Sequence, residues 1–442
     1  MSRTDGKLDT MPAGRAAYDV GLDSQGRPVI AGKRRQAATR CALNMYASVT
    51  GNTGGNFWSG HKTPKGCGSI SDIELVFSNY LGASHPEANG TSTFTLKVAI
   101  EYPSGTFIPA WINGSRTATI EPGARVRISA PGVSIPEDTY FQAHSNPVGA
   151  AWSEALMPVR AAQNEGAQRG TTTDRTMTAS GMTIADGGNC MVPNQIIATM
   201  ETPTNALVFF TDSTGLGLLD ISPAEYMGFL AIAFGNELPW VQAGQPSIGA
   251  YEFGVVSGSM WRRLQASTEG VTDAIDALGQ NDVANATPFT LAQIQASKIA
   301  IWLELQRRNI RVWPTTITPK STTSNAWINQ IGIAPDVRQG PGGTRVLLND
   351  WIRDGAPMVN GAAVATGTVD ALRSGDDGHP CAGYFEIADL VEVNASTGAF
   401  ERNTGVWKLS YLATSDGLGV HPNTTGSTAM AAGIDVDLIK SA

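Results

Sequence analysis

An alternation of strands and helices begins near residue 200 and constrains the fold of this chain more than any other feature of its sequence. Leu207 to Phe210 is a continuous apolar run, as expected for a strand buried on both faces. Thr290 and Gln293 have capping-box spacing and predict a helix to about Arg308, after which Val312 to Ile317 resumes as a strand. Strand, helix and strand in this order predict a parallel sheet with covering helices, an α/β fold of three layers (αβα).

The chain before residue 160 has a different pattern, in which short runs of alternating apolar and polar residues are separated by Gly, Pro, Asn and Ser. This pattern predicts an antiparallel β-sandwich, which we expect to be jelly-roll-like. Its strands are expected at Ile73 to Phe77, Phe94 to Ile100, Thr117 to Ile120 and Arg125 to Ile128. We therefore expect an N-terminal extension (1–39), an accessory β-sandwich (40–160), a linker rich in Gly and Thr (161–200) and the α/β domain (201–442).

Charge and hydropathy exclude two classes of partner. The formal net charge is -8, and the one basic cluster, Lys33 to Arg35 with Arg40, is small, so we expect no nucleic-acid partner. No run reaches the roughly 18 apolar residues of a membrane-spanning helix, so we expect no membrane partner. The first residues are polar and lack the apolar segment of a secretory signal. We expect a soluble protein that stays in the cytoplasm, leaves the cell without a classical signal, or is associated with a virion.

The four cysteines do not favour a metal site. Cys41, Cys67, Cys190 and Cys381 are scattered without the C-x-x-C spacing that zinc sites use. We predict buried thiols, with a bridge between Cys41 and Cys67 as the alternative. We expect neither a metal nor a cofactor.

Four short segments of the α/β half carry candidate catalytic groups. Ser213 follows the buried run, and in open α/β sheets the carboxyl ends of strands are where active sites lie. Asn281 offers an amide after a turn glycine, Gly258 offers a backbone N–H before an expected helix, and His421 precedes a proline near the end of the chain. Each segment alone has an ordinary structural explanation, as a helix cap or a turn, and only their combination favours a site.

Together these segments resemble the blocks of the SGNH (GDSL-type) hydrolase superfamily of esterases and lipases, over about residues 200 to 442. The matching residues are Thr211-Asp212-Ser213, Gly258, Gly279-Gln280-Asn281-Asp282, and Asp416 with His421-Pro422. Asn349 to Arg353 is similar to the helix that precedes the last strand of the family, and Phe385 to Asp389 to that strand.

The resemblance implies a serine esterase that works through an acyl-enzyme. Ser213 would be the nucleophile, His421 the general base and Asp416 the acid that orients the imidazole. The backbone N–H groups of Ser213 and Gly258 and the side-chain amide of Asn281 would form the oxyanion hole.

The sequence departs from the pattern of the family at two points. Thr211 stands where the family usually has glycine, and its side chain is expected to narrow the site or alter the loop. Four residues, including Gly417 and Gly419, separate Asp416 from His421, where the family has two. His379, in Asp376-Asp377-Gly378-His379-Pro380, has the usual spacing, but it precedes the expected last strand, so we prefer His421. We expect His61, His85 and His144 to be structural or on the surface.

The accessory β-sandwich suggests the substrate class. Its aromatic residues would stack on sugar rings or fill the core of the sandwich: Phe57, Trp58, Tyr80, Tyr102, Phe107 and Trp111. The first alternative predicts an O-acetylated polysaccharide as substrate and a carbohydrate O-deacetylase as enzyme. The competing hypotheses are a lipase or thioesterase, and a structural or receptor-binding virion protein with an SGNH-like fold, weak or lost catalysis and virion assembly partners.

Overall fold

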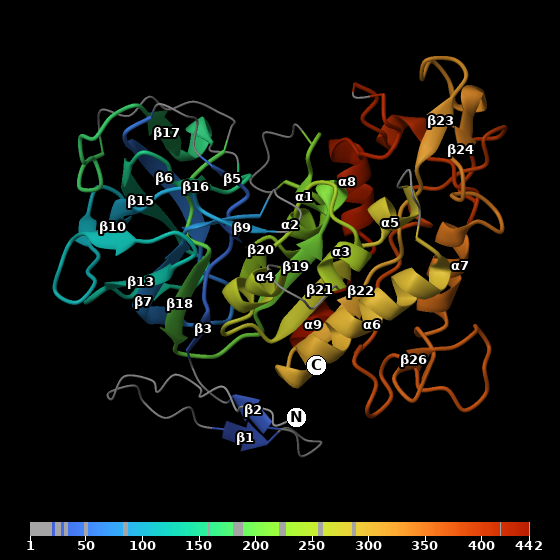
Figure 1. Cartoon of the computed structure of the whole chain (residues 1–442), viewed down its shortest axis with the longest axis horizontal. Coiled ribbons are helices and arrows are strands. Elements are labelled where there is room, and N and C mark those ends of the chain that lie inside the picture. Colours follow the sequence, from blue (N-terminus) through green and yellow to red (C-terminus); the bar gives the residue numbers. More distant parts are fainter. Residues whose placement is uncertain are drawn as a thin grey trace, which may run out of the picture.

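The computed structural model describes most of the chain. The described residues are 20–22, 28–30, 34–47, 52–82, 87–157, 160–179, 189–220, 227–254, 260–284, 289–415 and 417–441. Two antiparallel sheets from the first half of the chain lie beside a parallel sheet with its helices (Figure 1). The structure therefore shows the predicted change from antiparallel to parallel pairing along the chain.

The first antiparallel sheet has the order β11-β10-β15-β6-β17, with β12 also paired to β10. Its strands are β6 (Gly55–Lys62), β10 (Phe94–Glu101), β11 (Phe107–Pro109), β12 (Ala118–Ile120), β15 (Tyr140–Gly149) and β17 (Gly166–Arg169). In β10 the side chains of Phe94, Leu96 and Val98 are buried while Thr95 and Lys97 are partly exposed. This alternation is what a strand with one face on the core requires.

The second antiparallel sheet has the order β13-β7-β18-β3, with β14 also paired to β7. Its strands are β3 (Arg34–Gln36), β7 (Ser69–Ser78), β13 (Arg125–Ala130), β14 (Ile135–Pro136) and β18 (Gln195–Met200). Ile73, Leu75 and Phe77 of β7 are buried in the same apolar core as Leu96 and Val98 of the first sheet. Three of the four strands predicted in this half lie within observed strands, and the fourth, Thr117 to Ile120, begins one residue before β12.

The predicted extension and linker are wrong where they contain strands of these sheets. β3 belongs to residues 1–39, and β17 and β18 belong to residues 161–200. In β18 the side chain of Gln195 is buried, because its amide donates to the carbonyl of Glu269 and accepts from Arg125. A buried glutamine at the start of a strand hides the alternation by which strands are recognised.

The parallel sheet has the order β22-β21-β19-β20-β4, and each of its pairings is parallel. Its strands are β4 (Cys41–Ala42), β19 (Leu207–Thr211), β20 (Trp240–Gln242), β21 (Asp273–Ala277) and β22 (Arg311–Pro314). The edge strand β4 comes from the N-terminal part of the chain, so the domain division at residue 200 does not hold for this sheet. β19, which leads to Ser213, lies in the middle.

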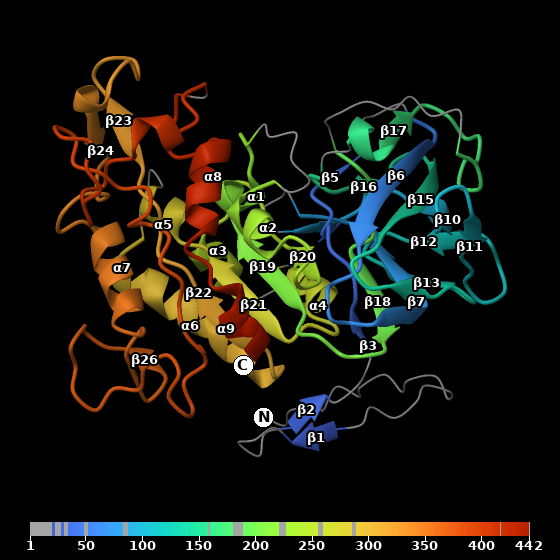
Figure 2. The same ribbon diagram turned by 180° about the vertical axis from the view of Figure 1, so that it is seen from behind.

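Helices cover both faces of the parallel sheet. α3, α4 and α6 lie in front of it in Figure 1, and α8 and α9 lie in front of it in the opposite view of Figure 2. The helices are α1 (Ser213–Leu216), α2 (Phe229–Phe234), α3 (Ala250–Gly254), α4 (Met260–Ser267), α5 (Gln280–Ala284), α6 (Leu291–Arg307), α7 (Thr344–Arg353), α8 (Thr424–Ala431) and α9 (Val436–Ser441). The predicted capping box at Thr290 and Gln293 is present at the start of α6.

The segment predicted as the last strand, Phe385 to Asp389, is not a strand. Phe385 makes a single parallel bridge with Thr315, and the chain then turns. Thr316 Oγ1 accepts hydrogen bonds from the N–H groups of Ile387 and Ala388, at 2.9 and 3.0 Å. A side chain therefore satisfies backbone donors that a longer ladder would otherwise pair.

Short two-stranded pairs and 3₁₀ turns complete the described structure. The pairs are β1 (Val20–Leu22) with β2 (Pro28–Ile30), β5 (Tyr46–Ala47) with β16 (Ser153–Glu154), β8 (Tyr80–Leu81) with β9 (Ala88–Asn89), β23 (Ser321–Thr323) with β24 (Ile333–Pro335), and β25 (Met358–Val359) with β26 (Ala362–Ala363). The 3₁₀ turns are η1 (Ala161–Gln163), η2 (Gln330–Gly332) and η3 (Leu409–Tyr411).

The four cysteines are buried free thiols, as predicted, and Cys41 and Cys67 are not bridged. Within the described ranges no helix combines the length and apolar character needed to cross a bilayer.

Candidate active site

Ser213 lies at the junction of the central strand and the first helix of the α/β half. β19 ends at Thr211, and Ser213 is the first residue of α1, where it is partly exposed. Asp212 caps the helix, because its Oδ1 accepts a hydrogen bond from the N–H of Thr214 at 2.8 Å. The N–H of Ser213 is one of the N-terminal donors that have no partner within a helix, which suits it to receive negative charge.

The Thr211 side chain lies beneath this turn and is 1% exposed. Its methyl and hydroxyl groups occupy space beside Gly215 and Gly244. A Cβ on Gly215 would overlap Thr211 Oγ1, and a Cβ on Gly244 would lie 2.6 Å from Thr211 Cγ2. The prediction that Thr211 narrows the substrate site is therefore wrong, since its side chain is buried below the turn and two glycines make room for it.

His421 reaches Ser213 from the end of the chain. Its Nε2 lies 2.8 Å from Ser213 Oγ, and its side chain is buried. The backbone carbonyl of His421 accepts from the N–H of Ala413 at 2.8 Å. The following Asn423 caps α8 by accepting from the N–H of Gly426 at 3.0 Å. The histidine is thus held between a paired backbone segment and a capped helix, as a general base must be.

Two glycines shape the loop that leads to His421. Gly417 and Gly419 both have φ of 65°, the left-handed region that favours glycine. A Cβ on Gly419 would overlap the carbonyl oxygen of Ser321 and lie 2.6 Å from the ring of Trp327. Asp416 lies outside the described residues, so its role as the orienting acid stays a prediction.

The alternative histidine, His379, is engaged elsewhere. Its Nε2 lies 3.0 Å from the carbonyl of Ala356, and its Nδ1 accepts from the N–H of Cys381 at 3.0 Å. Burial lowers the pKa of His379. Both ring nitrogens serve the local turn, and the structure brings His421, rather than His379, to the serine.

The remaining described histidines are structural, as predicted. His61 contacts Ser59 Oγ and the carbonyl of Thr39, and burial lowers its pKa to about 3. His144 lies 2.9 Å from Glu101 and stacks on Trp58. His85 lies outside the described residues.

Asn281 lies beside the serine turn. Its Nδ2 donates to the carbonyl of Ile248 at 2.9 Å and lies 3.4 Å from Asp212 Oδ2. The contact with Asp212 is long and therefore weak, so this N–H can donate to another acceptor at little cost. Gly258, the other predicted donor, lies outside the described residues.

Asp282 fixes the position of a neighbouring helix, a role that was not predicted from the sequence. Its carboxylate accepts from the N–H groups of Ala250 and Tyr251, at 2.6 and 2.9 Å, at the start of α3. A cap supplied from 31 residues away leaves no local sequence signal. This contact joins α5, which carries Asn281, to the start of α3.

Two buried carboxyl groups next to the site have raised pKa values. Burial raises the pKa of Asp212 to about 6, although hydrogen bonding from Thr214 and the nearby His421 oppose the shift. Burial also raises the pKa of Asp282 to about 6. The site therefore contains groups whose charge changes in the weakly acidic range.

The aromatic residues proposed for sugar stacking divide into two groups. Phe57, Trp58 and Tyr80 are buried in the core, so for them the sugar-stacking hypothesis is wrong. Tyr102 and Phe107 are partly exposed, and Trp111 is 38% exposed with the guanidinium of Arg116 over its ring. The second group keeps aromatic surface that a ligand can reach.

In the described part of the chain, no three His, Cys, Asp or Glu side chains are grouped so that they could hold a metal ion. The site that the structure describes consists of a hydroxyl, an imidazole and an amide at one edge of the sheet. These groups can carry out nucleophilic catalysis with general-base assistance.

Comparisons with known proteins find likeness only among solved structures, since no family model and no curated protein matches the chain. A GDSL-like lipase from Bacteroides thetaiotaomicron is 16% identical, covers 54% of this chain and 89% of its own, and has a TM-score of 0.35. A family two carbohydrate esterase from Clostridium thermocellum, in complex with cellohexaose, is 13% identical, covers 91% and 95%, and has a TM-score of 0.30.

A lipolytic protein of the G-D-S-L family from Desulfitobacterium hafniense is 13% identical, covers 52% of this chain and 96% of its own, and has a TM-score of 0.33.

Proposed function

We propose that this chain is an SGNH-type serine esterase. The observation that carries the proposal is the 2.8 Å distance between Ser213 Oγ and His421 Nε2, at the carboxyl edge of a parallel sheet. Residues 208 positions apart meet there, with the hydroxyl on a helix N-terminus and the imidazole held by its backbone. This is the arrangement in which a histidine can activate a serine.

The proposed reaction is acyl transfer in two steps. Ser213 Oγ attacks the ester carbonyl carbon while its proton passes to His421 Nε2, and the bond to the leaving alcohol then breaks as the alcohol takes that proton. Water next gives a proton to His421 and attacks the acyl-enzyme, and the proton returns to Ser213 as the carboxylic acid leaves. Each step uses the same imidazole as base and then as acid.

The oxyanion of each tetrahedral intermediate needs preorganised donors. The N–H of Ser213 and the amide of Asn281 lie at the described site, and Gly258 is proposed as the third donor. Asp416 is proposed to accept from His421 Nδ1–H and to stabilise the imidazolium. Neither Gly258 nor Asp416 is among the described residues, so both roles rest on the resemblance in sequence.

The proposed substrate is an O-acetylated carbohydrate. Partly exposed aromatic rings near the histidine segment support this proposal, since such rings offer apolar faces to sugars. Phe400 is 54% exposed, and the centre of its ring lies 6.3 Å from the centre of the Tyr411 ring. The ammonium of Lys408 lies 4.5 Å from each of these two ring centres. The carbonyl of Tyr411 accepts from the N–H of Asn423, two residues after His421. On the other half of the chain, Trp111 in an accessory β-sandwich is a second proposed contact for sugar.

A lipase is the second candidate, and a different set of side chains favours it. Leu418, three residues before His421, is 53% exposed, and Ile328 and Ile331 are 78% and 74% exposed. Trp327, next to Ile328, lies against Gly419. Apolar surface beside the catalytic loop would suit a longer acyl chain.

One set of assays tests the function and ranks the two substrates. Purified protein and its Ser213→Ala variant are assayed on p-nitrophenyl acetate, p-nitrophenyl octanoate and acetylated xylan. We expect Ser213→Ala and His421→Ala to lose at least about 10³-fold in kcat, and His379→Ala to keep most of it. Equal rates for wild type and Ser213→Ala would reject the serine mechanism, and faster turnover of octanoate than acetate would favour the lipase.

Phe400→Ala tests the carbohydrate part of the proposal separately. This variant should lose activity on acetylated xylan and keep activity on p-nitrophenyl acetate, which has no sugar to stack. Leu372→Ala is the matched control, because Leu372 is similarly exposed at 44% and outside the proposed contact. Unchanged xylan activity in Phe400→Ala would contradict a role for this ring.

A further inference from the structure

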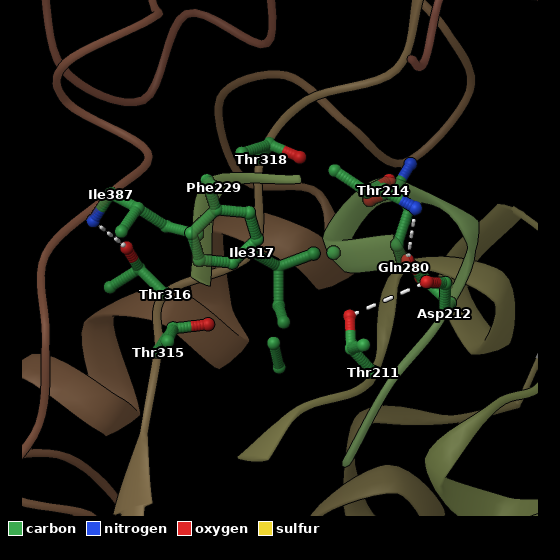
Figure 3. A pocket seen from close by; sticks show the side chains of 12 residues that line it. Thr211, Asp212, Thr214, Phe229, Gln280, Thr315, Thr316, Ile317, Thr318 and Ile387 are labelled. Atoms are coloured by element: carbon green, nitrogen blue, oxygen red, sulfur yellow. Dashed lines mark hydrogen bonds between the residues drawn. The ribbon is translucent and has the colours of Figure 1, made fainter. Parts of the chain in front are cut away.

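A small cavity lies directly beneath the turn that carries Ser213. It lies at the carboxyl ends of β19, β21 and β22 and is lined by twelve residues, which Figure 3 shows. Gln280 and Thr214 lie on one side in this view, and Thr315, Thr316 and Ile387 on the other. The space open to the centre of a water molecule is about 10 Å³. That is close to the smallest volume that holds one water.

Two side chains bring polar atoms into this cavity that have no hydrogen-bond partner among the described residues. They are the hydroxyl of Thr315 and both the nitrogen and the oxygen of the Gln280 amide. The hydroxyl of Thr214 also lines the cavity and hydrogen-bonds to the carboxylate of Asp212. Thr214, Thr315 and Gln280 are 6%, 0% and 4% exposed. Buried polar groups without a partner are rare because each is destabilising, and three such atoms at one cavity therefore indicate a ligand.

The neighbouring polar groups show that the local fold does satisfy its hydrogen bonds. Thr316 Oγ1, one residue after Thr315, accepts from the N–H groups of Ile387 and Ala388 and donates to Glu386 at 2.7 Å. Leu278, two residues before Gln280, donates its N–H to Asp276 at 3.1 Å. Thr316, which also lines the cavity, thus has protein partners, whereas Thr315 and Gln280 do not.

The chemistry of these atoms identifies the ligand class. Two hydroxyls can each donate or accept, and the amide of Gln280 supplies donors and an acceptor. A water molecule has two donors and two acceptors and typically makes about three such bonds when buried. A metal cation is excluded because it would give the Gln280 nitrogen no acceptor. An anion is excluded because no Lys, Arg or His side chain lines the cavity.

We propose that the cavity is a binding site for one ordered water molecule that links Gln280, Thr214 and Thr315. Gln280 precedes Asn281 at the start of α5, and Thr214 follows Ser213, so this water connects the helix that carries the oxyanion amide to the turn of the nucleophile. Gln280 is then a positioning residue, and it is the variable member of the Gly-x-Asn-Asp block. The water site follows from the cavity alone, whereas its effect on catalysis rests on the proposed function.

Water-oxygen magnetic relaxation dispersion counts long-lived internal waters without any assay of activity. Wild type and Gln280→Met are compared, since methionine is similar in size but has neither amide donor nor acceptor. We expect Gln280→Met to lose one long-lived water. A crystal structure of the wild type should show that water within hydrogen-bond distance of Gln280 and Thr315. An equal count in both proteins, or a dry cavity in the crystal, would overturn the proposal.

The sign of a stability change gives an independent test. A Thr315 hydroxyl bonded to water makes Thr315→Val destabilising, so the midpoint of urea unfolding falls. A buried hydroxyl with no partner at all would make the same replacement stabilising, because valine removes a desolvated polar group. Thr316→Val is the matched control and should lower the midpoint, since Thr316 has three protein partners. A raised midpoint for Thr315→Val would contradict the water site.

The catalytic effect is measured last. If Gln280 positions Asn281 through the water, Gln280→Met should lower kcat on p-nitrophenyl acetate roughly ten- to hundredfold with little change in KM. A loss of the water with unchanged kcat would remove the positioning role and leave the binding site. Failure of the esterase itself would show as inactivity of the wild type, which the relaxation and unfolding measurements do not require.

Discussion

Thr211 and Gly215 fit together at the base of the nucleophile turn only because the glycine has no side chain. The Thr211 side chain is buried against the first turn of α1, where a Cβ on Gly215 would overlap its hydroxyl. The family usually has glycine at the position of Thr211. In this chain the Thr211 side chain, at the end of β19, fits because Gly215 in α1 has no side chain. The two positions therefore depend on each other.

Gly215→Ala should therefore destabilise the protein by about 1–3 kcal/mol, the usual cost of overpacking a core. In a Thr211→Gly background the added methyl has space, and the same replacement should cost little. Urea unfolding of the four proteins gives the coupling energy between the two positions.

Gly254→Ala is the control for this cycle. Gly254 is also in a helix, but a Cβ there would lie 2.8 Å from the carbonyl oxygen of Ser297 and not near Thr211. Gly254→Ala should lower the free energy of unfolding by the same amount in the wild-type protein and in the Thr211→Gly background. Additive costs for Gly215→Ala and Thr211→Gly would show that the two side chains do not compete for space.

Local signals in the sequence predicted the parts of the fold that depend on neighbouring residues. The capping box at Thr290 and Gln293 starts α6, and the alternation from Phe94 marks β10. The order of the sequence blocks also brought together Ser213 and His421, because each block has a fixed place on the sheet edge. These predictions needed only short-range chemistry or a shared topology.

The parts that sequence did not predict depend on distant partners. β4 is only Cys41 and Ala42, and it is a strand because it pairs with Val241 and Gln242, about 200 residues away. β15 was missed because Gln142 and His144 are polar but buried, each with polar partners. Burial of polar groups by long-range hydrogen bonds removes the alternation that reveals a strand.

Replacing Asn281 by alanine should slow the chemical step. The amide is the side-chain donor of the proposed oxyanion hole, and loss of one such donor typically lowers kcat about 10²- to 10³-fold. KM should change little, since the oxyanion exists only in the transition state and the intermediates. Steady-state kinetics on p-nitrophenyl acetate measures both constants.

The amide of Asn281 also donates to the carbonyl of Ile248, so a structural effect needs its own readout. Labelling of Ser213 by an organophosphonate, followed by mass spectrometry, reports whether the nucleophile is still formed. A labelled Asn281→Ala protein with wild-type kcat would exclude the amide from the oxyanion hole.

The raised pKa of Asp212 should appear as a pH dependence of stability. Its folded value is about 6, against an ordinary value of 3.8. Between about pH 4 and 6 the unfolded chain loses this proton while the folded protein keeps it, so stability falls as the pH rises through this window. The contribution is fully present below about pH 4 and is lost above about pH 6, with a size of roughly 3 kcal/mol.

Asp212→Asn should remove this contribution because an amide does not ionise, while its oxygen can still accept from the N–H of Thr214. Relative to wild type, the variant should gain stability between pH 5 and pH 7.5 in urea unfolding at constant ionic strength. Asp377→Asn, at an exposed aspartate, is the control and should follow the wild type. A constant difference between Asp212→Asn and wild type across this range would show that Asp212 ionises normally.

Arg263 of α4 and Glu87, which directly precedes β9, should join the antiparallel half of the chain to the α/β half. Their side chains are fully buried and form an ion pair in which Arg263 Nε lies 2.7 Å from Glu87 Oε1. The same guanidinium donates to the carbonyls of Ala243 and Gly244, in the loop after β20, at 2.6 and 3.0 Å. Glu87→Leu leaves the buried guanidinium of Arg263 without a carboxylate partner and should destabilise the protein by about 3–5 kcal/mol. The double variant Arg263→Met with Glu87→Leu should be destabilised by less than the sum of the two single variants. Thermal unfolding of the single and double variants measures the coupling, and strictly additive losses would show that the pair does not join the two parts of the chain.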